Sequence, residues 1–158
     1  MDWNIDKCLT GLEGAVAVPP DKSISHRAVI FASISEGTCR VKNFLFGEDC
    51  MRTHDAFRAM GVEIHRDKDS LMISGKGLKG LSRPGRELYM GNSGTSMRII
   101  SGVLAGQPFP SKLTGDDSLS KRPMKRVLKP LRAMGAAVNA RDDVYPPIEF
   151  EPAGGPLD

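Results

Sequence analysis

Two short loops carry residues whose types and spacing suit the binding of a small, multiply charged anion. They are Pro20-Asp21-Lys22-Ser23 and Gly91-Asn92-Ser93-Gly94-Thr95, and each precedes a sequence that predicts a helix. The first backbone N–H groups of a helix have no partner within it, and the helix dipole adds partial positive charge at that end. Both loops are therefore predicted to attract an anion.

Cationic side chains strengthen this prediction. Lys22 supplies a mobile ammonium, and Arg27 supplies a planar guanidinium that suits carboxylate or phosphate. Ser23 and Arg27 are four residues apart, as are Gly94 and Arg98, so each pair lies on one helix face. The alternative is two capped helices with solvated cations. Because two equivalent loops each have an arginine one turn into the helix, we favour an anion site.

A third candidate is the stretch from Ser118 to Met124. Arg122 directly precedes a predicted helix that Pro123 opens, and the alternative here is an ordinary surface helix start. The following basic residues are predicted to form a solvated face: Lys125, Arg126, Lys129 and Arg132. The pairs Glu48-Asp49 and Asp116-Asp117 each precede a predicted helix and are interpreted as caps.

An internal repeat relates the first two loops. Three segments recur in the same order 68 to 74 residues later: 25–30 as 96–101, 47–49 as 115–117, and 57–64 as 131–138. A repeat at a nearly constant offset predicts two copies of one structural unit. An offset of 71 residues places Ser23 at Gly94 and Arg27 at Arg98.

The first copy predicts two helices and three strands that position the first loop. A helix over 23–35 is expected to be capped by Ser23 and ended by Gly37, with an apolar stripe of Ile24, Ala28, Phe31 and Ala32. A strand over 38–41, a helix over 49–60 and a hairpin of 62–65 and 71–74 follow. In the second helix we expect Ala56, Phe57 and Met60 to point inward and Gly61 to end the helix.

The second copy predicts the same order with a strand before its first helix. Strands are expected over 87–90, 111–114, 136–140 and 148–150, and helices over 94–105 and 122–134. Met124, Val127, Leu128 and Leu131 have helical spacing. Pro123 suits the first turn, Pro130 is expected to kink or shorten the helix, and Gly135 ends it.

Each copy is therefore a strand-helix-strand-helix-strand-strand unit, which indicates an α/β (α+β) fold of mixed sheets with helices packed on one face. We assign 19–84 to the first unit and 85–158 to the second, preceded by an N-terminal strand segment, 1–18, that belongs to a partner domain. The tail from Glu151 onward has the composition of a loop or linker, so we expect a further domain after it.

Composition indicates a globular protein that binds small acidic metabolites. The chain is 40% hydrophobic and 26% charged, its net charge is +3, and its one Trp, two Tyr and six Phe are too few for a base-stacking platform. The cysteines and histidines indicate neither a metal site nor a disulfide framework. Cys8, Cys39 and Cys50 form no C-x-x-C, and His26, His54 and His65 have no metal spacing, so we expect no metal and a reducing compartment. His26 is interpreted as a packing or supporting residue. No apolar run is long enough for a membrane span and the N-terminus lacks signal-peptide features, so a cytoplasmic location is expected.

Three motifs in order resemble the 5-enolpyruvylshikimate-3-phosphate synthase family. They are Pro20-Asp21-Lys22-Ser23-Ile24-Ser25-His26-Arg27, Gly91-Asn92-Ser93-Gly94-Thr95-Ser96-Met97-Arg98 and Ser120-Lys121-Arg122-Pro123-Met124. The resemblance covers nearly the whole chain, but family members are more than twice as long, so the chain resembles their N-terminal portion. It implies six βαβαββ units in two domains that close on substrate, the inside-out barrel of the enolpyruvyl transferases.

The resemblance also implies the reaction and the residues that serve it. The family transfers the enolpyruvyl group of phosphoenolpyruvate to the 5-hydroxyl of shikimate 3-phosphate, in the pathway to aromatic amino acids, without metal or organic cofactor. Lys22 is the implied catalytic residue and contacts both substrates. Shikimate 3-phosphate is held by Lys22, Ser23 and Arg27; phosphoenolpyruvate by Lys22, Asn92, Gly94 and Arg122; Arg98 and Thr95 support the second loop.

The acid and base carboxylates of the family lie beyond residue 158, so we expect this chain to be inactive alone and the full-length protein to be a monomer. The response to the herbicide glyphosate stays open. Many plant and enteric members have Pro at the position of Ile99, and Ser93 replaces the common Ala. The stretch 118–124 resembles the insensitive branch, whereas Gly94 stands where that branch carries a bulkier residue.

Two other functions are compatible with parts of the sequence. The enolpyruvyl transferase that acts on UDP-N-acetylglucosamine has Lys-Asn where this chain has Lys22-Ser23, and it carries a reactive loop cysteine that no cysteine here matches. A non-enzymatic module that binds nucleic acid or a protein through the basic helix over 122–132 is the second alternative. It leaves the two matched loops unexplained.

Overall fold

The computed structural model describes residues 4, 11, 13–155 and 157, which form seven strands, four α-helices and one 3-10 helix. The first group is α1 (Lys22–Ile34), β1 (Glu36–Val41), α2 (Glu48–Ala59), β2 (Glu63–Asp67) and β3 (Ser70–Lys76). The second is β4 (Leu88–Tyr89), α3 (Gly94–Leu104), β5 (Ser111–Thr114), the 3-10 helix η1 (Leu119–Lys121), α4 (Lys125–Ala133), β6 (Val138–Arg141) and β7 (Tyr145–Phe150).

The two groups repeat one sheet topology. The first sheet has the order β1-β3-β2 with antiparallel neighbours, and the second contains the equivalent β5-β7-β6, also antiparallel. In the second sheet β4 pairs with β5 in parallel, so that sheet is mixed. Among the described residues no strand takes the corresponding place beside β1. The predicted α/β arrangement of repeated units is confirmed.

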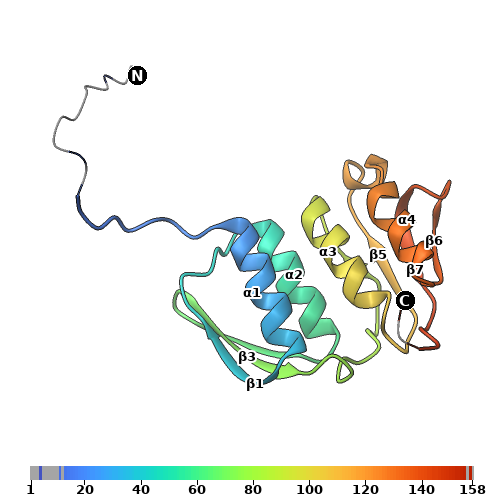
Figure 1. Cartoon of the computed structure of the whole chain (residues 1–158), viewed down its shortest axis with the longest axis horizontal. Coiled ribbons are helices and arrows are strands. Elements are labelled where there is room, and N and C mark those ends of the chain that lie inside the picture. Colours follow the sequence, from blue (N-terminus) through green and yellow to red (C-terminus); the bar gives the residue numbers. More distant parts are fainter. Residues whose placement is uncertain (1–3, 5–10, 12, 156, 158) are drawn as a thin grey trace.

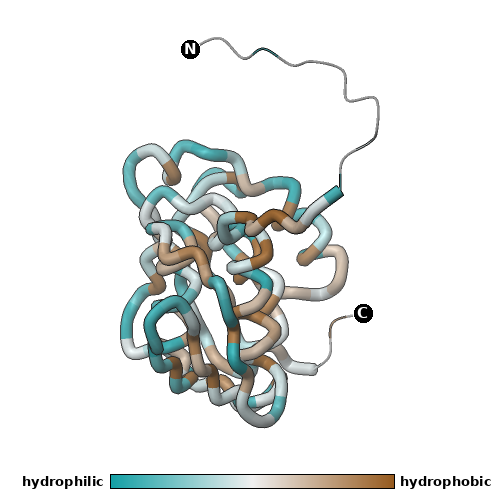
Figure 2. The backbone as a smooth tube through the Cα atoms, turned by 90° about the vertical axis from the view of Figure 1, so that its left-hand side faces the viewer, coloured by the Kyte–Doolittle hydropathy of each residue, from teal (hydrophilic) through white to brown (hydrophobic). Residues whose placement is uncertain are grey.

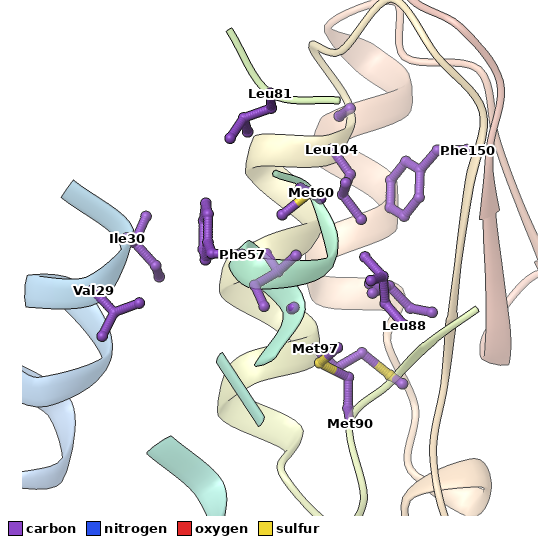
Figure 3. Close-up of a cluster of buried hydrophobic side chains, with 14 of the residues drawn as sticks. Val29, Ile30, Phe57, Met60, Leu81, Leu88, Met90, Met97, Leu104 and Phe150 are labelled. Atoms are coloured by element: carbon purple, nitrogen blue, oxygen red, sulfur yellow. The ribbon is translucent and has the colours of Figure 1, made fainter. Parts of the chain in front are cut away.

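The helices pack on the sheets and on one another around a core that runs through both units. Figure 1 shows α1, α2 and α3 side by side, with α4 beside β5, β6 and β7. In Figure 3, Phe57 of α2 lies between Ile30 of α1 and the side chains of α3, and Phe150 extends the cluster to the second sheet. Each of these side chains is less than 5% exposed, including Leu104 of α3. Burial of this continuous apolar cluster joins the units.

Several sequence predictions hold closely. Ala56, Phe57 and Met60 are buried as expected, and Gly61 ends α2 with a φ of +89° that favours glycine. Gly135 has the same φ just after α4. Figure 2 shows hydrophobic stretches within the packed body and also in the segment that leads toward the N-terminus, where Val16 and Val18 are exposed.

The predicted apolar stripe of α1 holds only in part: Ala32 is buried and Ala28 half-buried. Ile24 and Phe31 are each 61% exposed, whereas Ser25 and His26 are buried. Apolar residues occur on both faces of this helix, so apolar spacing alone does not identify the buried one. The buried side combines Val29 and Ile30 in the apolar core with hydrogen bonds to other elements, for example from the backbone N–H of Leu45 to the hydroxyl of Ser25 at 3.0 Å.

The predicted ends of α1 are also corrected. The cap is Asp21, whose carboxylate accepts a hydrogen bond from the Ile24 backbone N–H at 2.7 Å, and Ser23 lies inside the first turn. Asp21 has extended backbone dihedrals, as a capping residue requires. The helix ends at Ile34, and Gly37 lies within β1 with a φ of +87°.

The helix predicted over 122–134 begins three residues later than expected. The 3-10 helix η1 precedes it, and Arg122 follows η1 in an extended conformation. Pro123 therefore lies before α4 and not in its first turn. α4 contains Pro130 and continues to Ala133, so the shortening occurs at its start. Leu128 and Leu131 are buried along its predicted apolar stripe.

Most of the predicted N-terminal strand segment, 1–18, lies outside the described residues. Residues 13–20 form neither helix nor strand and lead away from the helices in Figure 1. Among the described helices, none combines the length and the apolar character that crossing a membrane requires.

Candidate anion-binding site

The first turns of three helices meet at one end of the molecule. His26 of α1 hydrogen-bonds to the hydroxyl of Thr53 in α2 at 2.8 Å, and Thr53 to the hydroxyl of Ser96 in α3 at 2.9 Å. The helices are therefore in contact near their amino-terminal ends, where each dipole is positive. Such an arrangement favours a small anion near the exposed first turns.

The first predicted loop places Lys22 and Arg27 at this end with exposed side chains. The Nζ atom of Lys22 lies 3.0 Å from a carboxylate oxygen of Asp49, and about half of the Lys22 side chain is exposed. Ser23 and Arg27 are both exposed on α1. These three residues can meet an incoming ligand without a change of the backbone.

The second loop brings its glycine against two guanidinium groups. Gly94 is buried, and a Cβ atom built on it would lie 2.5 Å from Nη1 of Arg98 and 3.5 Å from Nη1 of Arg122. Ser93 caps α3 by accepting a hydrogen bond from the Ser96 N–H at 3.2 Å. Arg98 and Arg122 therefore lie against the first turn of α3, where the missing side chain leaves room for them.

Arg122 is attached to the second loop across thirty residues of sequence. Its guanidinium donates to the backbone carbonyl of Asn92 at 3.3 Å, to the Asn92 amide oxygen, and to the hydroxyl of Ser118 at 3.2 Å. Asn92 in turn donates through Nδ2 to Asp116 at 2.9 Å. The structure thus unites Asn92, Gly94 and Arg122, which the sequence placed in two separate motifs.

Asp116 is an anchor that sequence reasoning recognised only as a helix cap. Its carboxylate accepts the Leu119 backbone N–H at 2.7 Å, which caps η1, and also the Asn92 amide. The hydrogen bond from Leu119, followed by that from Asn92, lowers the pKa of Asp116 below its ordinary value. The Asp116 carboxylate is therefore ionised at neutral pH, where it accepts the hydrogen bond from Asn92.

Asp49 was predicted to be a helix cap, but it performs a different task. The residue that caps α2 is Gly47, which makes no side-chain capping bond. The Asp49 carboxylate pairs with Lys22, and its backbone carbonyl accepts a hydrogen bond from the Ser96 hydroxyl at 3.0 Å. Asp49 consequently touches both predicted loops, which no local sequence signal indicated.

The remaining basic residues divide into two groups. Arg98 donates to the Pro123 carbonyl at 3.4 Å and lines a groove with Lys125, Arg126, Lys129, Pro123 and Pro130, next to the second loop. Arg132 instead hydrogen-bonds to the carbonyl of Val138 at 3.1 Å and to Asp143, so its role is structural. Thr95 is half-buried in the first turn of α3.

Cysteine, histidine and carboxylate groups of the described residues form no cluster that could hold a metal ion. Cys39 and Cys50 are free thiols, and Cys8 lies outside the described residues. Burial raises the pKa of the Cys50 thiol, which keeps it protonated at neutral pH.

Comparison with known proteins identifies the family of the chain. The family model for EPSP synthase (3-phosphoshikimate 1-carboxyvinyltransferase) matches residues 8–156. The chain is 52% identical over 141 residues to the 3-phosphoshikimate 1-carboxyvinyltransferase of Streptococcus pyogenes serotype M49, covering 89% of this chain and 33% of that protein. It is 56% identical over 131 residues to the enzyme of that name from Oceanobacillus iheyensis, covering 83% of this chain and 30% of that protein.

A solved structure of EPSP synthase from Acinetobacter baumannii superposes with a TM-score of 0.86 at 50% identity, covering 92% of this chain and 33% of that chain. The chain therefore spans about a third of the length of the relatives it matches. The match along nearly the whole sequence and the shared fold show that the chain belongs to the EPSP synthase family.

Proposed function

We propose that the full-length protein transfers the enolpyruvyl group of phosphoenolpyruvate to the 5-hydroxyl of shikimate 3-phosphate and releases phosphate. The observation that carries this proposal is the convergence of the two repeat-related loops with Lys22 and Arg122 at one end of the molecule, in a chain of this family. Both substrates are strongly anionic, so a site built from helix starts and cations matches their charge.

In the proposed reaction the 5-hydroxyl oxygen adds to C2 of phosphoenolpyruvate while C3 takes up a proton. The tetrahedral adduct then loses phosphate from C2 and a proton from C3. This chain contributes binding and orientation: Lys22, Ser23 and Arg27 hold shikimate 3-phosphate, and Lys22, Asn92, Gly94 and Arg122 hold phosphoenolpyruvate. Lys22 lies between the two ligands and offsets their mutual repulsion, while Arg98 and Thr95 support the second loop.

Steady-state assays of the full-length protein test this proposal. Phosphate release should require both phosphoenolpyruvate and shikimate 3-phosphate. UDP-N-acetylglucosamine should not replace shikimate 3-phosphate as acceptor. Phosphate release with UDP-N-acetylglucosamine but not with shikimate 3-phosphate as the acceptor of the enolpyruvyl group would assign the protein to the other enolpyruvyl transferase activity.

The 158-residue chain itself should bind anions but not turn over, because the proposal assigns no acid or base carboxylate to it. Purified chain assayed with both substrates should show no phosphate release above the buffer rate. Turnover by the chain would contradict this assignment. The same preparation should not bind random duplex DNA at physiological salt; salt-dependent binding through Lys125, Arg126 and Lys129 would favour the nucleic-acid alternative.

We further propose a cytoplasmic monomer that uses neither metal nor cofactor. Free Cys39 and Cys50 are consistent with a reducing compartment. Light scattering of the full-length protein would establish the oligomeric state, and activity in the presence of a strong chelator would test the independence from metal.

A further inference from the structure

A chain of buried polar side chains connects the two loops. It consists of His26, Thr53, Ser96 and Ser93, each at most 1% exposed. The distances are 2.8 Å from His26 Nδ1 to the Thr53 hydroxyl, 2.9 Å from Thr53 to the Ser96 hydroxyl, and 2.7 Å from Ser96 to the Ser93 hydroxyl. Ser96 also reaches the Asp49 backbone carbonyl at 3.0 Å. Four buried groups from three helices thus form one network.

The direction of every hydrogen bond in this network follows from the proton count. The Asp49 carbonyl can only accept, so the single hydroxyl proton of Ser96 goes to it. Thr53 and Ser93 must then donate to Ser96, which leaves Thr53 as the acceptor for His26. His26 therefore carries its proton on Nδ1.

This network is attached to both groups of ligand-binding residues. His26 directly precedes Arg27 and lies one turn after Lys22 on α1. Ser93 lies between Asn92 and Gly94 in the second loop. A shift of α1 relative to α3 would therefore lengthen the hydrogen bonds through Thr53.

The repeat shows that the unit can fold without the polar groups of His26 and Thr53. The position of His26 in the second copy is Met97, and that of Thr53 is Val127, at offsets of 71 and 74 residues. Met97 is fully buried. Burying hydroxyl and imidazole groups costs free energy unless their hydrogen bonds are made, and Nε2 of His26 has no partner among the described residues. In the second unit the buried Met97 and the half-buried Val127 take the equivalent positions. His26 and Thr53 therefore serve something other than packing.

We propose that His26, Thr53, Ser93 and Ser96 are positioning residues that hold the two anion-binding loops at one spacing, so that a ligand on one loop strengthens binding on the other. This inference rests on the proposed function, because it takes shikimate 3-phosphate and phosphoenolpyruvate as the two ligands. Thr53 is the central member, since it joins α1 to α3 through α2.

The test replaces the Thr53 hydroxyl in the full-length protein with a methyl group of similar size. The affinity for phosphoenolpyruvate is measured by calorimetry with and without saturating 5-deoxyshikimate 3-phosphate, which lacks the hydroxyl that reacts, in wild type, Thr53→Val, Thr53→Ser and Ser33→Ala. The ratio of the two affinities should fall roughly fivefold in Thr53→Val, the effect of about one hydrogen bond, and return in Thr53→Ser. Ser33 is the matched control because it is a fully buried α1 hydroxyl without a hydrogen-bond partner among the described residues.

An unchanged ratio in Thr53→Val, even with a lower melting temperature, would overturn the inference, because a purely structural residue lowers stability without altering the coupling. A wild-type ratio of one would also overturn it. If wild type binds both anions with coupling but does not release phosphate, the proposed function fails and the inference stands. A nitrogen-15 NMR spectrum of His26 should show protonated Nδ1 in wild type, and protonation at Nε2 would contradict the bond directions.

Discussion

The cations of the candidate site have protein partners that an anion can replace or join. Lys22 lies 3.0 Å from Asp49, and Arg122 is held by the oxygens of Asn92 and by Ser118. These partners fix each cation near its working position, so a ligand loses less side-chain entropy on binding. Both pairs are partly exposed, so each contributes little to the free energy of folding. The main effect of these contacts is to orient the Lys22 and Arg122 side chains.

Removing either cation of the first loop should lower activity strongly. In the full-length enzyme, Lys22→Ala and Arg27→Ala should each reduce kcat/KM roughly tenfold or more, because a charge-assisted hydrogen bond to an anion is lost. Steady-state kinetics measure this effect. Lys79→Ala is the control, since Lys79 is exposed near Ile34 and Gln107, away from the first turns of α1 and α3. Near-normal kinetics in both test variants would refute the role assigned to this loop.

A methyl group at Gly94 should interfere with the second loop. Gly94→Ala would bring Cβ to 2.5 Å from Nη1 of Arg98. The Arg98 guanidinium must therefore move toward Arg122 or away from the loop. We expect a several-fold higher KM for phosphoenolpyruvate and a smaller change in the KM for shikimate 3-phosphate. Gly102→Ala on the same helix is the matched control, because nothing lies within 4 Å of its added Cβ. Equal effects of the two variants would argue against steric interference at the site.

At the scale of elements, the position of α1 depends on a cap that the sequence pattern assigned to the wrong residue. Asp21 has the extended backbone that lets its carboxylate reach the Ile24 N–H, whereas Ser23 already has helical neighbours on both sides. The start of α4 is also later than the pattern indicated, because η1 and the extended Arg122 precede it, and the Asp116 carboxylate accepts a hydrogen bond from the Leu119 N–H in η1. Asp21 and Asp116 each precede a segment that carries cations of the candidate site. The residues at these helix starts therefore also help to arrange the site.

The two candidate caps of α1 can be compared directly. Asp21→Ala should lower the free energy of unfolding by about 1 kcal/mol, whereas Ser23→Ala should change it by only a few tenths. Urea denaturation of the two variants and wild type provides the measurement. A larger loss in Ser23→Ala than in Asp21→Ala would show that the cap is Ser23 after all.

At the scale of the whole molecule, the two units share one apolar core and several polar contacts. Phe57 and Met97 belong to a buried cluster that also includes Phe150 of the second sheet. Thr53 of the first unit meets Ser96 of the second at the helix starts, and the Gln107 side chain donates to the Leu78 carbonyl at 3.3 Å. Burial of apolar area joins the units, and the directional bonds select their relative position.

The buried imidazole of His26 should make stability depend on pH. Burial lowers the pKa of His26 below its ordinary value of 6.5; the nearby Asp49 carboxylate opposes this and Lys22 adds to it. The unfolded chain then binds more protons than the folded one between the two pKa values. The free energy of unfolding should therefore fall as pH falls through about 6.5 and level off below the folded pKa.

Denaturation between about pH 7.5 and pH 5 tests this effect in wild type and in His26→Gln. The loss of stability on acidification should be smaller in His26→Gln than in wild type. His65→Gln, at an exposed position in β2, should keep the wild-type pH dependence. Identical pH profiles for wild type and His26→Gln would contradict the assignment of a buried neutral imidazole.

Local patterns were enough to predict the element order, the two related loops and the cationic residues. Apolar periodicity depends on near neighbours, so α2 and the stripe of α4 were predicted well, including the burial of Phe57 and Leu128. The repeat then placed Arg27 and Arg98 in equivalent positions. The family resemblance rests on the same contiguous motifs.

The tertiary structure decided what those motifs contact. Asp49 pairs with Lys22 across 27 residues of sequence, and Arg122 reaches Asn92 across 30. The buried polar face of α1 exists because His26 finds Thr53 on another helix, a partner that helical periodicity within α1 does not reveal. A hydrogen bond or ion pair depends on where two distant segments come to lie, and that position is determined by the packing of the entire core.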